Sequence, residues 1–276
     1  MSPARLRNGY WPAWLPAGLC VLGVAGAGCQ SPGHLGGPQR YRQGVVYVLP
    51  GIEGPRPWNR DIMLGLDEGG VTSAIEIFDW TVGIPGSEMI NLTDLERNRR
   101  QARRLANRIL AYRRRYPGRP VHLVGHSGGG GIAVLALEAL PAGRQIDMAI
   151  LLAPALSPKY DLSRALRRVR AGICSFYSEQ DVSFLKVGTT LFGPIDRAFG
   201  FSAGAVGFEI PLGLKKEDRQ LYFDRLRQVS WNERLERHGA SGTHLGWTSR
   251  RFAREYLAPL IQRNEAGRPL PAELVE

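Results

Sequence analysis

Short, unbroken apolar runs that alternate with longer segments of helical periodicity constrain the fold of this chain most. The first run covers residues 44–49, reads Gly-Val-Val-Tyr-Val-Leu and is closed by Pro50 and Gly51. Such a run is typical of a strand buried on both faces, because neither face carries the polar residues of a solvated sheet. Similar runs follow at residues 74–80, 121–124, 148–153 and 173–178, with a weaker one at 229–231.

Helical patterns separate these runs. We expect helices over residues 59–68, 94–116, 128–140 and 248–262. The order strand, helix, strand, helix is typical of a parallel sheet with right-handed crossovers. The sequence therefore predicts an α/β fold in which a mostly parallel sheet is flanked by helices.

The net charge of +11 suggests a surface that attracts nucleic acid or anionic lipid. The arginines are concentrated in the predicted helix 94–116, whose apolar residues recur at three- and four-residue spacing. That spacing places Arg97, Arg100, Arg103, Arg104, Arg108 and Arg115 largely on the opposite, solvated face. We therefore interpret the charge as a solvated helix face and, because no nucleic-acid module motif accompanies it, predict no nucleic-acid partner.

The N-terminus has the three-part layout of a secretory signal. Arg5 and Arg7 precede an apolar stretch over residues 15–27, which is too short for a membrane span and ends in small residues before Cys29. The segment Val-Ala-Gly-Ala-Gly-Cys at residues 24–29 resembles the bacterial lipobox. This resemblance implies that residues 1–28 are removed and that Cys29 carries a lipid.

The resemblance further implies an exported protein of the bacterial cell envelope, held to a membrane by its lipid anchor. Gly26 stands where the lipobox pattern prefers a larger aliphatic residue. Ordinary signal cleavage near Ala25 or Ala27 therefore stays open as the alternative.

The composition of the remaining chain suggests four further segments. Residues 29–43 are rich in Gly and Pro and are predicted to form a flexible tether, followed by one folded domain over residues 44–264 and a C-terminal tail over 265–276. Within the domain, residues 182–216 combine many glycines with Phe and Leu before the last strand. This insertion is predicted to be either a packed excursion or an apolar lid over the substrate.

The motif with the clearest chemistry is Gly125-His126-Ser127-Gly128-Gly129, which matches G-x-S-x-G. It lies between the predicted strand 121–124 and the predicted helix 128–140, as the mechanics of the motif require. Glycines allow a sharp turn that raises the Ser127 hydroxyl clear of the backbone. The following helix directs its first N–H groups towards developing negative charge.

With this motif the chain resembles the α/β-hydrolase superfamily over most of residues 44–263. The resemblance implies an α/β-hydrolase fold and a serine nucleophile followed along the chain by an acid and then a histidine. A Ser hydroxyl is a poor nucleophile at neutral pH, so it needs an imidazole base and a carboxylate that orients the imidazole.

Only His238 and His244 follow Ser127 in the chain. His244 lies in a loop just before the last predicted helix, where the family places its base, whereas His238 ends a charged stretch. For the acid we select Asp181, which follows the apolar run 173–178. Two carboxylates remain as alternatives to Asp181, namely Glu179 and Asp161, and Asp181 could instead cap a helix that begins near residue 182.

The oxyanion of acyl transfer usually needs two backbone N–H donors, one after the nucleophile and one after an early strand. By the resemblance these are Gly128 and Ile52, with Pro50 in the place of the family's His. Glu53 is either structural or a substrate contact. No cluster has metal-ligand spacing and no phosphate-binding loop is present, so we expect neither a metal nor a cofactor.

These residues predict a serine hydrolase that cleaves a carboxylic ester or related acyl bond of a small or lipid-like substrate through an acyl-enzyme. Two alternatives stay open. An acyltransferase uses the same three residues with an alcohol as acceptor. A non-catalytic, lipid-anchored binding module keeps the fold without turnover, because fold alone does not fix function.

Overall fold

The computed structural model describes residues 33–181, 195–196 and 200–268. A six-stranded sheet with the order β2-β1-β3-β4-β5-β6 forms its centre, and each neighbouring pair is parallel. The predicted α/β fold with a mostly parallel sheet is therefore confirmed. The strands are β1 (Val45–Leu49), β2 (Ala74–Ile77), β3 (Val121–His126), β4 (Ile146–Leu152), β5 (Val169–Tyr177) and β6 (Leu226–Ser230).

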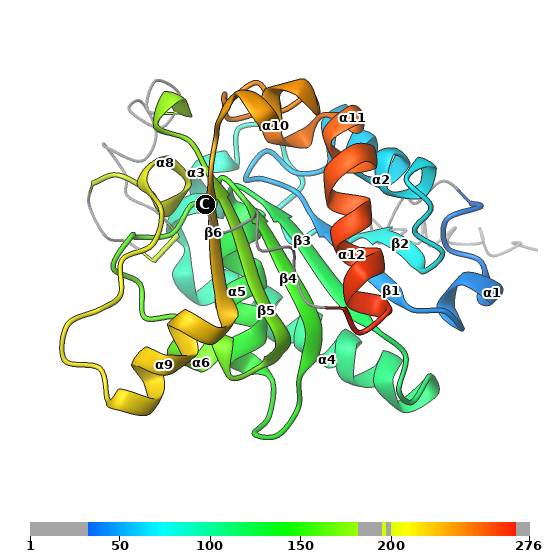
Figure 1. The fold of residues 1–276 in the computed structure, drawn as a ribbon, viewed down its shortest axis with the longest axis horizontal. Coiled ribbons are helices and arrows are strands. Elements are labelled where there is room, and N and C mark those ends of the chain that lie inside the picture. Colours follow the sequence, from blue (N-terminus) through cyan, green and yellow to red (C-terminus); the bar gives the residue numbers. More distant parts are fainter. Residues whose placement is uncertain (1–32, 182–194, 197–199, 269–276) are drawn as a thin grey trace, which may run out of the picture.

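Helices cover both faces of this sheet (Figure 1). In chain order the helical segments are α1 (Pro38–Tyr41), α2 (Pro57–Glu68), α3 (Glu88–Thr93), α4 (Leu95–Arg115), α5 (Gly128–Ala139), α6 (Ser163–Leu166), η1 (Glu179–Asp181), α8 (Ala203–Val206), α9 (Lys216–Arg225), α10 (Glu233–Arg237), η2 (Gly246–Thr248), α11 (Arg250–Phe252), η3 (Ala253–Leu257) and α12 (Ala258–Glu265). The closing helix predicted over residues 248–262 is thus one continuous run from α11 to α12 that contains a π-helical segment, η3.

The two faces of the sheet bury separate apolar clusters. On one face α4 contributes Leu105 and Ile109, and α5 is buried along nearly its whole length. On the other face α2 packs against the run from α11 to α12, with Leu66 and Phe252 fully buried. The apolar spacing of α4 orients it as the sequence predicts, and its N-terminus is capped by Asp94, which accepts a hydrogen bond from the Arg97 N–H.

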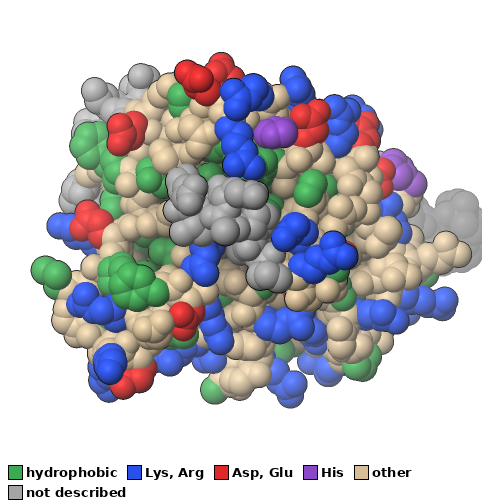
Figure 2. All heavy atoms as spheres, viewed as in Figure 1, with side chains coloured by type: hydrophobic (Ala, Val, Ile, Leu, Met, Phe, Trp, Pro, Cys, Tyr) green, Lys and Arg blue, Asp and Glu red, His purple; other side chains and the backbone are tan. Residues whose placement is uncertain are grey.

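One arginine of α4, Arg97, differs from the predicted solvated face, and Arg108 is exposed but paired. Arg97 is half-buried and donates to the carbonyl of Trp80 at 2.8 Å. Arg108 is exposed but pairs with Glu76, a residue of β2 that is only 3% exposed. Arg100, Arg103 and Arg104 are exposed, as predicted. On the face drawn in Figure 2, Lys and Arg side chains are spread over several separate groups.

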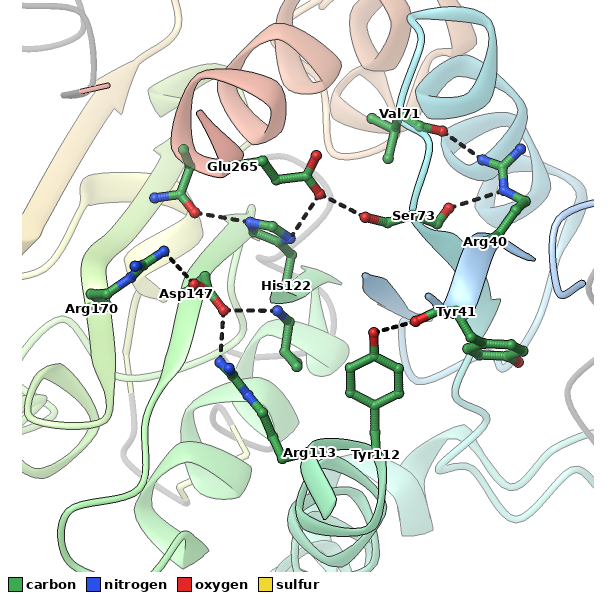
Figure 3. Close-up of polar contacts among 12 residues, drawn as sticks. Arg40, Tyr41, Val71, Ser73, Tyr112, Arg113, His122, Asp147, Arg170 and Glu265 are labelled. Atoms are coloured by element: carbon green, nitrogen blue, oxygen red, sulfur yellow. Dashed lines mark hydrogen bonds and ion pairs between the residues drawn. The ribbon is translucent and has the colours of Figure 1, made fainter. Parts of the chain in front are cut away.

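Residues 33–43, which the sequence predicts as a flexible tether, are packed against the domain. Leu35 is fully buried, and its carbonyl accepts from the Ile75 N–H at 3.0 Å. Arg40 donates to the Asp67 carboxylate and to the carbonyls of Val71 and Ser73, as Figure 3 shows in part. Composition misses this docking because one buried Leu and one multidentate Arg suffice to attach a short Gly- and Pro-rich segment.

Buried polar groups cluster where the strands begin, at the end of the sheet remote from the Ser127 turn (Figure 3). Asp147 of β4, 4% exposed, accepts from Arg113 at 2.7 Å, from Arg170 at 2.5 Å and from the Val121 N–H at 2.8 Å. Nearby, Glu265 accepts from the Ser73 hydroxyl at 2.7 Å. The last residue of α12 thus contacts the domain, although the sequence assigns it to the C-terminal tail.

Several sequence predictions lie outside the described residues. These are the signal over 1–28, the lipidation site Cys29, and the parts of the predicted insertion at 182–194 and 197–199. The described part of the insertion contains α8 and the start of α9. Among the described helices, none combines the length and the apolar character needed to cross a bilayer.

Candidate active site

Ser127 occupies a strained turn between β3 and α5. Its backbone has φ 54° and ψ −121°, a region that L-residues rarely adopt and that costs on the order of 1–3 kcal/mol. A methyl group on Gly125 would lie 2.5 Å from the Gly129 carbonyl oxygen, and one on Gly129 would lie 2.5 Å from that of Pro50. The two glycines therefore allow the close approach that the turn requires, and Ser127 stays 6% exposed.

Asp181 and His244, distant in sequence, form a buried pair. His244 Nδ1 lies 2.8 Å from Asp181 Oδ2, and the two residues are 7% and 1% exposed. Burial raises the pKa of the Asp181 carboxyl above its usual range, although the hydrogen bond from His244 acts in the opposite direction. The other oxygen, Oδ1, has no hydrogen-bond partner among the described residues. A carboxylate in this position holds the imidazole with its proton on Nδ1, which makes Nε2 the basic nitrogen.

The two alternative acids, Asp161 and Glu179, lie in environments that differ from that of Asp181. Asp161 Oδ1 accepts from the Ser163 N–H at 2.9 Å and from the Tyr222 hydroxyl at 3.2 Å. Although partial burial acts to raise it, these hydrogen bonds lower the pKa of Asp161. Glu179 is exposed at the start of η1. The Asp161 contacts belong to the packing of α6 against α9.

The loop that carries His244 is shaped by close contacts with the Asp181 segment. Gly242 adopts φ 74°, and a methyl group there would lie 2.9 Å both from Gln180 Oε1 and from the Trp231 ring. Trp231 in turn donates from Nε1 to the Ala240 carbonyl at 2.7 Å. The other downstream histidine, His238, lies 3.3 Å from Glu255 and has a partly exposed side chain.

His126 connects the nucleophile turn with the base loop, a role that the sequence analysis missed. Its Nε2 lies 3.0 Å from the His244 carbonyl oxygen, and the two imidazole centroids are 4.8 Å apart. Burial, together with the nearby His244, lowers the pKa of His126 to about 3, so the ring is neutral and donates from Nε2. Strand alternation could have found this contact, because His126 shares a strand face with His122 and Val124.

The two residues expected to supply the oxyanion donors, Ile52 and Gly128, are neighbours in the fold. A methyl group on Gly128 would lie 2.8 Å from Ile52 Cγ2 and 3.0 Å from Trp80 Cζ2. Gly128 is the first residue of α5, so its N–H has no acceptor within the helix. Glu53 folds back over Gly51 and accepts from the Trp58 indole N–H at 3.0 Å. This hydrogen bond links Glu53 to Trp58 of α2.

Two other features lie away from these residues. A cavity of about 780 Å³ lies at the opposite end of the sheet and includes Arg113, Arg144 and Asp147 in its lining. Across the part of the chain that the structure describes, no group of three or more His, Cys, Asp or Glu residues is placed to hold a metal ion. Cys174 is a fully buried free thiol whose pKa burial raises to about 12.

Comparison with family models matches a part of the chain that contains the serine turn. The model of the S33 serine aminopeptidase family matches residues 100–182, a segment that includes Ser127 and Asp181. No curated protein matches the chain in sequence.

The solved structures similar to the chain are distant. Lipase B of Aspergillus fumigatus is 15% identical with a TM-score of 0.48, over 87% of this chain and 60% of the lipase, so the chain spans about three fifths of its length. A poly(3-hydroxybutyrate) depolymerase of Bordetella parapertussis is 17% identical with a TM-score of 0.42, over 87% of this chain and 85% of that one. A putative cell surface hydrolase of Lactobacillus plantarum is 11% identical with a TM-score of 0.36, over 84% and 95%.

The parallel sheet order, the serine turn between β3 and α5 and the family match define an α/β-hydrolase fold.

Proposed function

We propose that this protein is a serine hydrolase that cleaves a carboxylic ester or related acyl bond through an acyl-enzyme on Ser127. The observation that carries the proposal is the buried Asp181–His244 pair. The loop of His244 is joined to the serine turn by a hydrogen bond from His126, which directly precedes the strained Ser127. Neither a buried carboxylate nor a strained Ser is needed for folding, and both are typical of catalytic sites.

In the proposed reaction the Ser127 hydroxyl oxygen attacks the substrate carbonyl carbon while His244 Nε2 takes the hydroxyl proton. The N–H groups of Ile52 and Gly128 donate to the oxyanion of the tetrahedral intermediate. Collapse breaks the bond to the leaving alcohol, which receives the proton from His244. Water, activated by the same imidazole, then cleaves the acyl-enzyme and releases the acid.

Exposed apolar side chains next to the proposed catalytic segments support one class of substrate. Leu245, directly after the base, is 39% exposed, and Ile90, next to the Asn91 that hydrogen-bonds the loop of Ile52, is 49% exposed. These apolar surfaces favour a small or lipid-like ester. The protein's proposed location, exported and anchored through a lipid on Cys29, would place it at a membrane.

A fluorophosphonate probe tests the proposal, because it reacts with an activated serine. We expect folded wild-type protein to be labelled at Ser127 and to hydrolyse esters, and Ser127→Ala to lose labelling together with on the order of 10⁴-fold or more of turnover. Ser175→Ala is the matched control, since its buried hydroxyl in β5 has no hydrogen-bond partner among the described residues.

Full activity of Ser127→Ala would contradict the proposal. Folded protein that resists labelling would favour the non-catalytic binding module. An added alcohol that captures most of the acyl group would instead identify an acyltransferase on the same residues.

A further inference from the structure

The loop that carries Ile52 has three successive backbone carbonyls that are all held by hydrogen bonds. The Trp80 indole N–H donates to the Pro50 carbonyl at 2.8 Å, and the Gly54 N–H donates to the Gly51 carbonyl at 3.2 Å. The Asn91 side-chain amide donates to the Ile52 carbonyl at 2.8 Å. Each peptide plane across this short loop therefore has a fixed orientation.

The direction of the Ile52 N–H follows from these contacts. This N–H belongs to the same trans peptide unit as the Gly51 carbonyl, so the two point in opposite directions within one plane. The turn bond from Gly54 sets that plane, while Trp80 and Asn91 hold the planes on either side of it. Both side chains come from the segment between β2 and α4 and thus fix the loop from outside.

Trp80 also contacts the second oxyanion donor. It is fully buried, and its ring edge would lie 3.0 Å from a methyl group on Gly128. One rigid side chain therefore contacts the start of α5 and hydrogen-bonds the loop of Ile52. Its position sets the spacing between the two expected N–H donors.

Asn91 belongs to a buried network that fixes its amide. The side chain is 1% exposed, and its Oδ1 accepts from the Val82 N–H at 2.9 Å and from Arg97 at 3.3 Å. Its backbone carbonyl accepts from the Asn98 amide at 2.7 Å. Because Oδ1 faces two donors, Nδ2 is the group that faces Ile52, and the amide orientation is determined.

We propose that Trp80 and Asn91 are positioning residues that hold the Ile52 N–H in the direction needed to stabilise the oxyanion. The inference rests on the proposed serine hydrolase function and assigns a catalytic purpose to a network that touches neither Ser127 nor His244. Displacement of a preorganised donor weakens stabilisation of the transition state while leaving ground-state binding largely unchanged.

Asn91→Asp tests the role of Asn91 with nearly the same shape. The carboxylate keeps an acceptor for Val82 and gains an ion pair with Arg97, but it loses the donor to the Ile52 carbonyl and repels that oxygen. We expect kcat to fall about 10- to 100-fold with KM within about 2-fold, less than the roughly 10²- to 10³-fold loss on removal of a whole oxyanion donor. The rate of fluorophosphonate labelling should fall in parallel, while the shape of the pH profile of kcat should not change.

Asn264→Asp is the matched control, because it makes the same change at a 5% exposed amide that contacts His122 at the other end of the sheet. We expect its kcat per labelled site to equal that of wild type. Trp80→Phe gives a second, independent variant that keeps a buried ring but loses the donor to Pro50, and we expect a fall in kcat of about 10-fold. Dividing the maximal rate by the number of sites labelled at saturation gives kcat for the folded protein alone, so unfolded protein does not lower the value.

A kcat within 2-fold of wild type in either folded variant would overturn the inference for that residue, as would a change confined to KM. Failure of the proposed function has a different signature, because wild-type protein would then be unlabelled and Ser127→Ala would be without effect. If Ser127→Ala abolishes turnover and both positioning variants retain it, only this inference fails.

Discussion

Replacing Asp181 with Asn separates the energetics of catalysis from those of folding. In the structure the Asp181 carboxylate accepts from His244 Nδ1 at 2.8 Å, which in the proposed mechanism makes Nε2 the nitrogen that takes the serine proton. An Asn amide at this position can donate to Nδ1, which moves the imidazole proton to Nε2 and removes the base. A comparable change in a known triad costs about 10⁴-fold. We therefore expect kcat to fall by roughly 10³- to 10⁴-fold, or about 4 to 5.5 kcal/mol of transition-state stabilisation.

The same substitution should not weaken the fold. Asp181 is 1% exposed, and its Oδ1 has no hydrogen-bond partner among the described residues, so the native state holds a poorly compensated charge. Burial raises the pKa of this carboxyl, which means that folding is disfavoured while the group is ionised. A neutral Asn avoids this cost. We expect the free energy of unfolding at pH 7 to be unchanged or higher by up to about 1 kcal/mol.

The stability effect has a defined pH dependence. Because the folded-state pKa of Asp181 is raised, the wild-type protein gains stability from this group as the pH falls through the raised value, and the gain is complete below the unfolded-state value. The stability difference between Asp181→Asn and wild type should therefore shrink as the solution is acidified. Steady-state ester hydrolysis and urea unfolding from pH 4 to 8 measure both effects. A kcat within tenfold of wild type, or a loss of more than about 2 kcal/mol in stability at pH 7, would refute the reasoning.

Two further predictions concern packing and location. Gly129→Ala should lower the free energy of unfolding by about 2–3 kcal/mol, because its methyl group would lie 2.5 Å from the Pro50 carbonyl oxygen. This loss is expected although Ala is the better helix former. The control is Gly37→Ala, which has no atom within 4 Å of the new methyl group and should leave the urea midpoint unchanged. We expect mass spectrometry to find a lipid adduct on the wild-type protein that Cys29→Ser lacks, and we expect this variant to be released from membranes. An unmodified Cys29 in the mature wild-type protein would count against lipidation.

The strands of the sheet were predictable because the apolar pattern that favours each strand lies within a few consecutive residues. An unbroken apolar run such as residues 44–49 has few alternatives to a buried parallel strand, and β1 spans Val45–Leu49. The end of a strand is harder to predict where a residue of the apolar run packs against another part of the fold instead. The apolar run 74–80 predicts a strand up to Trp80, but β2 ends at Ile77, and the Trp80 side chain instead packs on Gly128.

The residues that the sequence analysis missed act through contacts between distant segments. Asn91 and Arg97 are ordinary residue types without a motif, and their connection to Ile52 exists only once α3 and α4 lie against the loop after β1. By contrast, Ser127 and His244 could be proposed from the sequence because the chemistry of the motif demands a special turn and a partner base, and their catalytic roles stay predictions. The amphipathic pattern of α4 correctly placed the apolar face, yet it could not show that a half-buried Arg97 bonds a neighbouring loop.

Backbone strain occurs at two adjacent turns, at the ends of β3 and β4. Ser127 and Ala153 are the two non-glycine residues with positive φ in the described chain, and each directly follows one of the adjacent strands β3 and β4. The Ser127 N–H donates to the Leu152 carbonyl at 2.9 Å, and the Ala155 N–H donates back to the Ser127 carbonyl at 3.0 Å. The two turns are therefore joined to each other, and the hydrogen bonds at the ends of two adjacent central strands offset the backbone strain at Ser127.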